Sequence, residues 1–184
     1  MAEIDRRTRL EEPWLSFFRD VDRGLTRSVE IHCLGAFVMA VLWGLPRPTG
    51  DVDFIEVEPR QASDELLRLA GEDSPIARKH RIHLQRVAIA EFPADYASRL
   101  IDLDPQGLTR LSLRAFEVHD LVLAKLGRNS PKDRHDVQFL VANGALDPSV
   151  LKERYETELR PYVLNEPRHS LTISLWLNEF FGKG

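Results

Sequence analysis

The sequence has only one cysteine, Cys33, among its 184 residues. A single cysteine excludes an internal disulfide, and a reducing cytoplasm is its simplest setting. The six histidines are not spaced as zinc ligands, because His80 and His83 are followed by no cysteine or third histidine at zinc-site distance. Walker, dinucleotide-binding and Gly-x-Ser-x-Gly fingerprints are also missing. These absences argue against a disulfide scaffold, a zinc module and the commonest nucleotide-binding and hydrolase motifs.

Long hydrophobic runs and an excess of positive charge are lacking as well. The least polar window, residues 31–45, is shorter than the ~20 residues of a membrane-spanning helix, and residues 1–10 have no apolar signal core. The 25 basic and 29 acidic residues give a net charge of −4, which argues against general nucleic-acid binding but allows a local basic patch. We therefore expect a cytoplasmic protein that does not contact a membrane. The length and the hydrophobic content of 43% suit one domain with a small helical appendage.

The most informative stretch runs from Ser28 to Glu56. An apolar strand over residues 29–34 is followed by a Gly-Ala turn at Gly35 and an apolar helix over 37–43, and a second apolar strand opens with Asp51 and Asp53. Strand geometry places the two carboxylates on one face. Because they repel each other, they need a cation, and hard oxygen ligands favour Mg²⁺. The glycine lets a phosphate approach the backbone, and the following helix offers free N–H groups.

This arrangement resembles the nucleotidyltransferase superfamily, which has the polymerase-beta-like fold. The family signature is a Gly-Gly or Gly-Ser turn, a helix and then Asp-x-Asp on the next strand, and Ala36 departs from it at the second turn position. An Arg-x-Thr-x-Asp-x-Asp version, found in AbiEii-like and MenT-like toxin relatives, matches Arg47, Thr49, Asp51 and Asp53.

A second matching block lies downstream. Those relatives carry an Asp-Leu-x-x-x-Lys-Leu helix followed by Lys-Asp-x-x-Asp, which matches residues 120–126 with Lys125, then Lys132, Asp133 and Asp136. The two blocks together cover residues 28–142. We expect Lys125 to lay its stem along the apolar stripe of its helix and bring its ammonium to the edge of a cleft, and we expect Lys125→Ala to keep the fold. Asp136 is expected to contact either Lys125 or a ligand.

The resemblance implies the roles of the remaining candidate residues. Asp51 and Asp53 are catalytic and would bind Mg²⁺ or Mn²⁺, and Lys125 would contact nucleotide phosphate. Gly35 and Ala36 would bind the triphosphate of an NTP, together with Arg47 and Thr49, although Thr49 is equally suited to shaping its loop.

Active superfamily members use a third carboxylate on the strand after Asp-x-Asp. The strand expected over residues 82–92 has a single acid, Glu91, close to its end. Three alternatives follow: Glu91 is the third metal ligand, two aspartates suffice, or the domain is inactive.

The predicted fold class is α/β (α+β), with a nucleotidyltransferase-like mixed sheet flanked by helices and an α-helical C-terminal part. Residues 1–117 are expected to form the core, covered by an N-terminal helix over 14–25, and residues 118–184 to form helices packed on it. Further strands are expected over 83–92 and 108–116, and the Ser-Pro and Asp-Pro steps at 130–131 and 147–148 predict helix starts.

Two hypotheses about function remain open. In the first, the protein is a Mg²⁺-dependent nucleotidyltransferase that moves a nucleotide from an NTP to tRNA or a protein, in a bacterial toxin–antitoxin setting with a cognate antitoxin as partner. In the second, it is a catalytically inactive module of the same fold that binds nucleotide or a partner protein. If RNA is the acceptor, the basic run at residues 78–81 is a candidate for phosphate contact.

Overall fold

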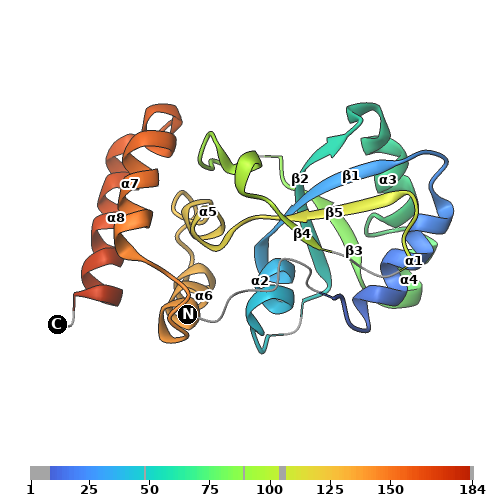
Figure 1. The fold of residues 1–184 in the computed structure, drawn as a ribbon, viewed down its shortest axis with the longest axis horizontal. Helices are drawn as coiled ribbons and strands as arrows, with labels where there is room; N and C mark the ends of the chain where they lie inside the picture. The colour runs from blue at the N-terminus through green and yellow to red at the C-terminus, as the bar shows by residue number, and fades with distance from the viewer. Residues whose placement is uncertain (1–8, 48, 89, 104–106, 183–184) are drawn as a thin grey trace. The chain divides into compact units, whose positions relative to one another are not determined.

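The computed structural model describes residues 9–47, 49–88, 90–103 and 107–182. These residues belong to two compact units (Figure 1). The sheet unit comprises the described residues of 2–88 and 100–116, and the helical unit comprises those of 89–99 and 117–184. Residues 89–99 thus belong to the helical unit.

The sheet unit contains a five-stranded mixed sheet in the order β3-β2-β1-β5-β4. The strands are β1 (Val29–Leu34), β2 (Asp51–Glu58), β3 (His83–Arg86), β4 (Ile101–Leu103) and β5 (Leu111–Ala115). β1 is antiparallel to β2 and parallel to β5, β3 is parallel to β2, and β4 is antiparallel to β5. The predicted mixed sheet is confirmed, as is the prediction that the first two strands are neighbours joined by a short helix, α2 (Gly35–Trp43).

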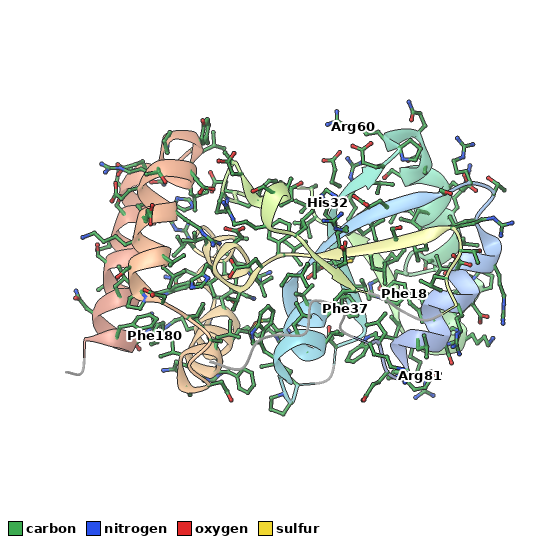
Figure 2. The ribbon with its side chains drawn as sticks, viewed as in Figure 1. Phe18, His32, Phe37, Arg60, Arg81 and Phe180 are labelled. Carbon is green, nitrogen blue, oxygen red and sulfur yellow. The ribbon has the colours of Figure 1, made fainter. Side chains whose placement is uncertain are left out.

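The apolar face of this sheet is covered by helices. These are α1 (Trp14–Gly24), α2, α3 (Ser63–Ala70, preceded by a 3-10 turn at Arg60–Ala62) and α4 (Pro75–His80). Phe18 of α1 and Phe37 of α2 are fully buried with ring centroids 5.6 Å apart, and both are labelled in Figure 2. Asp22 of α1 accepts hydrogen bonds from the backbone N–H groups of residues 109–111 at the start of β5. These contacts confirm α1 as a covering helix.

A β-bulge at Ile55 changes which side chains of β2 share a face. Cys33 of β1 is paired with Phe54 and the preceding residue, His32, with Glu56, so Ile55 is the extra residue. Without the bulge, acids at odd positions 51 and 53 would face away from acids at even positions 56 and 58, because side chains alternate along a strand. The bulge therefore places all four acids on one face.

Three elements of the structure differ from what the sequence predicts. β3 ends at Arg86 instead of residue 92, because its partner strand reaches the bulge immediately after Phe54. β4 was not predicted, because its three residues are too few to show an alternating pattern. α4 was not predicted, although its Ser74-Pro75 start has a capping side chain that accepts from the N–H of Ala77.

The helical unit consists of α5 (Val118–Leu123), α6 (Pro131–Ala142), α7 (Pro148–Arg154) and α8 (Glu166–Phe181), with a π-helical turn at Tyr155–Leu159 and 3-10 turns at Tyr96–Arg99 and Arg160–Tyr162. Ser130 and Asp133 form a capping box at the start of α6, and Asp147 caps α7, as the sequence predicts. α8 begins at Glu166, where the Asn165 side chain caps it and Pro167 fits its first turn. In the described part of the chain, no helix combines the length and apolarity that a membrane crossing requires.

Candidate functional site

The face of the sheet opposite the helices is polar. The strand registers place twelve side chains on this face. One is Leu34, and the other eleven are polar or charged: Glu30, His32, Asp51, Asp53, Glu56, Glu58, His83, Gln85, Asp102, Ser112 and Arg114. Six of these eleven are carboxylates and one is an arginine, so the face has an excess of negative charge. Such a face attracts cations and repels a free triphosphate, which makes it suited to binding a nucleotide only together with a metal ion.

Gly35 and Asp53 are in direct contact at the end of this face. Asp53 is paired with Leu34, the residue before the glycine, and Gly35 has a φ of +78°. A methyl group on Gly35 would overlap Oδ2 of Asp53 and lie 3.2 Å from its Cβ. Glycine is therefore required here both by the backbone angle and by the carboxylate against it. The structure thus brings together the two elements on which the sequence motif depends.

The start of α2 supplies backbone donors next to Asp53. Gly35 and Ala36 are its first residues, and the N-cap residue Leu34 has no side chain that accepts from them. The first N–H groups of a helix have no partner within the helix and carry partial positive charge, so they favour an anion such as phosphate. Gly35 and Ala36 therefore stay the candidate residues for binding phosphate.

Asp51 lies at the exposed start of β2. Its side chain is 57% exposed, and its Oδ1 is 3.7 Å from Nε2 of His83, its neighbour on β3. Thr49 donates a hydrogen bond from Oγ1 to the carbonyl of Asp51 at 3.2 Å, which supports its loop-shaping role. Arg47 is half-buried in the same loop. His83 was not predicted as a site residue. It could have been found from strand alternation, because His83 and Gln85 are two residues apart on the strand next to Asp51 and Asp53.

The donor chemistry of this corner fits a hard divalent cation. Mg²⁺ is commonly held by one or two carboxylates together with substrate phosphates, without a complete protein cage. Asp51 and Asp53 provide two carboxylates on one face, and Gly35 allows phosphate to approach them. Within the described ranges, no group of three His, Cys, Asp or Glu side chains is arranged to hold a metal ion. The phosphates of a nucleotide would therefore supply the remaining ligands.

Lys125 lies in the helical unit and is 5% exposed. Its Nζ is 3.0 Å from Oδ2 of Asp136 and 3.3 Å from Oδ1 of Asp133. Asp133 also accepts from Arg128 and Ser130, and although burial opposes its ionisation, these bonds and the Lys125 charge keep its pKa well below the usual range. The expected contact between Asp136 and Lys125 is confirmed. The ammonium was also expected at the edge of a cleft, but it lies in this buried cluster.

Glu91 is outside the sheet, because β3 ends at Arg86. It belongs to the helical unit, where its Oε1 accepts from the backbone N–H of Leu164 at 2.7 Å and its Oε2 is 2.9 Å from Nε2 of His169. The expectation that Glu91 lies on the strand after Asp-x-Asp is therefore wrong. The sheet position across from Asp53 is occupied by Gln85.

The mixed sheet, the glycine turn and the paired aspartates together define a nucleotidyltransferase-like protein. A family model described as "Nucleotidyltransferase of unknown function (DUF6036)" matches residues 27–178, and the chain belongs to that family. The match confirms the superfamily, while the closer likeness to AbiEii-like and MenT-like toxins stays a prediction. No curated protein and no solved structure matches the chain.

Proposed function

We propose that the protein is a metal-dependent nucleotidyltransferase that transfers a nucleotide from an NTP to an acceptor. The observation that carries this proposal is the contact between the Asp53 carboxylate and Gly35, with Asp51 on the same face and the uncapped start of α2 beside them. One corner of the sheet unit thus combines two carboxylates for a cation with backbone donors for a phosphate.

The chain's own residues have separate tasks in this reaction. Asp51 and Asp53 would hold Mg²⁺ or Mn²⁺, and such an ion would supply charge neutralisation for an in-line displacement at phosphorus. The N–H groups of Gly35 and Ala36 orient the phosphates. Arg47, from the loop before β2, is a further candidate to bind these phosphates. The excess of carboxylates on the sheet face disfavours a triphosphate that arrives without its cation.

Lys125 is retained as a candidate phosphate contact through the resemblance, and the buried ion pairs give it an additional task. Its charge compensates Asp133 and Asp136, which are 0% and 2% exposed. A buried carboxylate without a partner is strongly destabilising. We therefore propose that Lys125 also maintains the start of α6.

The acceptor and the biological setting follow from the resemblance alone. tRNA and a protein are both suitable acceptors, and a cognate antitoxin is the expected partner in a toxin–antitoxin setting. The basic run at residues 78–81 is a weaker RNA surface than its sequence suggests, because Lys79 and His80 both contact Asp20, at 2.6 and 2.7 Å. Arg78, Lys79 and Arg81 are all exposed, and Lys79 is the one of these three that contacts Asp20.

A non-catalytic nucleotide-binding module is the second candidate function, and Gln85 is the observation that favours it. Gln85 occupies the β3 position across from Asp53, so β3 presents a neutral amide there and no third carboxylate. An amide cannot accept a proton as a general base does. In this alternative, Asp51 and Asp53 still bind metal and nucleotide, but nothing is transferred.

Incubation with each labelled NTP, Mg²⁺ and total tRNA distinguishes the two functions, with self-labelling of the protein checked in the same reactions. We expect one or more NTPs to label RNA or protein, and the label to disappear with Asp53→Asn or when EDTA is added. Binding of nucleotide without any label would support the non-catalytic module. Labelling that persists in Asp53→Asn would contradict the proposed site.

A further inference from the structure

A polar hollow lies at the end of β2 far from Asp51 and Asp53. It has a volume of about 250 Å³ and is lined by Glu56, Val57, Arg60, Ser63 and Arg86. These residues come from the end of β2, the turn that starts α3 and the last position of β3. Arg60 is labelled in Figure 2. We call this hollow the Ser63 pocket.

Ser63 has an unmet hydrogen-bonding requirement. The residue is 7% exposed, and its Oγ has no hydrogen-bond partner among the described residues. Buried polar side chains in native proteins nearly always have a partner, so a hydroxyl without one requires an explanation. Because Ser63 lines a hollow, a ligand that accepts or donates a hydrogen bond there would explain it.

The charges of the pocket favour an anion. Arg86 is exposed and forms no ion pair with another described residue, while Arg60 contacts Glu56 through Nε at 3.1 Å. Two arginines and one glutamate give the pocket a net charge of +1. Guanidinium groups match the geometry of phosphate oxygens and bind them through paired N–H donors, and the Ser63 hydroxyl can donate a third bond.

The pocket is connected by β3 to the candidate active site. A groove of about 630 Å³ follows the outer edge of β3 and is lined by His83, Gln85 and Arg86 among others. His83 at one end is 3.7 Å from Asp51, and Arg86 at the other end also lines the Ser63 pocket. Arg86 lines both the groove and the pocket; without it the groove has one arginine, Arg68, against two acids, Glu72 and Asp73. Net positive charge is therefore concentrated at the pocket.

We propose that the Ser63 pocket binds a backbone phosphate of a single-stranded polynucleotide acceptor, an inference that rests on the proposed function. Asp51 and Val57 are six residues apart on β2, roughly 20 Å at about 3.3 Å per residue. A ligand that occupies both places must be extended and must carry phosphates along its length. A polynucleotide meets this requirement by following the β3 groove, with its reactive end at Asp51 and Asp53.

Titration of a fluorescently labelled single-stranded RNA oligonucleotide in the absence of NTP tests the pocket by itself. We expect Arg86→Ala to weaken RNA binding about tenfold, the scale of one charge-assisted hydrogen bond, and to lower the salt slope by about 1. Arg23→Ala is the matched control, because Arg23 is an arginine on α1 whose side chain is 76% exposed. RNA binding that is unchanged in Arg86→Ala, or reduced equally in Arg23→Ala, would overturn the proposal.

Ser63→Ala separates a binding role from a structural one. Because the hydroxyl has no partner within the described protein, its removal should leave the Tm unchanged or raise it while weakening RNA binding. A lower Tm with unchanged RNA affinity would show that Ser63 is structural and would contradict the proposal.

A parallel titration with an NTP and Mg²⁺ identifies the source of the phosphate. We expect both variants to bind NTP as the wild type does. If Arg86→Ala weakens NTP binding as strongly as RNA binding, the pocket holds a free nucleotide phosphate and the polynucleotide assignment is wrong. Absence of nucleotide transfer would contradict the proposed function but would leave the RNA titration interpretable, because that titration contains no NTP.

Discussion

Replacement of Lys125 by methionine would remove a buried charge while keeping most of the side-chain stem. Lys125, Asp133 and Asp136 are 5%, 0% and 2% exposed, and the ammonium is within 3.3 Å of both carboxylates. Asp133 keeps Arg128 and Ser130 as partners. Breaking a buried ion pair costs about 3–5 kcal/mol. The remaining partners of Asp133 favour the lower end, about 3 kcal/mol, which lowers Tm by about 6–12 °C at this chain length.

Denaturant and thermal unfolding monitored by circular dichroism measure this loss. Lys132→Met is the matched control, because Lys132 is exposed in the first turn of α6, and it should change stability by less than about 0.5 kcal/mol. Adding Asp136→Asn to Lys125→Met should recover part of the loss, since a neutral amide then replaces one of the two buried carboxylates that faced the ammonium. If Lys125→Met alone unfolds within about 0.5 kcal/mol of the wild type, the cluster does not have the energetic role assigned to it.

Three further predictions concern the sheet and the acid stability of the protein. Gly35→Ala should lower stability by about 1–2 kcal/mol, because its φ is +78° and its methyl would overlap Asp53, and it should weaken NTP binding; unchanged calorimetric titrations would refute this. Asp20, bonded by a lysine and a histidine, has its pKa lowered to about 2. For Glu117, burial is outweighed by a histidine and an arginine, and its pKa is also about 2. Both folded-state pKa values lie below the unfolded ones, so their stabilisation is present above about pH 4 and is lost as pH falls toward 2; unfolding titrations should show less acid sensitivity in Asp20→Asn and Glu117→Gln. Burial and the Asp53 charge raise the pKa of Cys33, so a thiol reagent should react with it only after unfolding, and rapid reaction in the native protein would contradict its placement.

The paired strands and the glycine turn were predictable from the sequence because the signals are local. Apolar residues recur along 29–34 and 51–58 between polar ones, and Gly35 lies directly between a strand and a helix. The contact between Gly35 and Asp53 follows from the short connection, which makes the two strands neighbours. The Ser63 pocket had no comparable signal, since its residues come from three elements whose meeting depends on the tertiary fold.

The bulge and the Lys125 cluster show why other features were not predicted. Two adjacent apolar residues, Phe54 and Ile55, interrupt the alternation of β2, but only the pairing register shows that Ile55 is extra. Lys125 was expected to tolerate alanine because no core volume is lost. The structure corrects the energetic reasoning, because its charge is buried against Asp133 and Asp136 eight and eleven residues away. Sequence spacing gives the identity of such partners but not their burial.

Metal-dependent nucleotide binding tests the central claim most directly. Calorimetric titration of each NTP, with and without Mg²⁺, should be run on the wild type, on Asp53→Asn and on Glu58→Gln, a control on the same strand and the same sheet face at its far end. The account predicts that Mg²⁺ strengthens NTP binding to the wild type and to Glu58→Gln, and that Asp53→Asn loses this dependence. Equal NTP affinity with and without Mg²⁺, or an undiminished Mg²⁺ effect in Asp53→Asn, would contradict the assignment of Asp51 and Asp53 as the nucleotide and metal site.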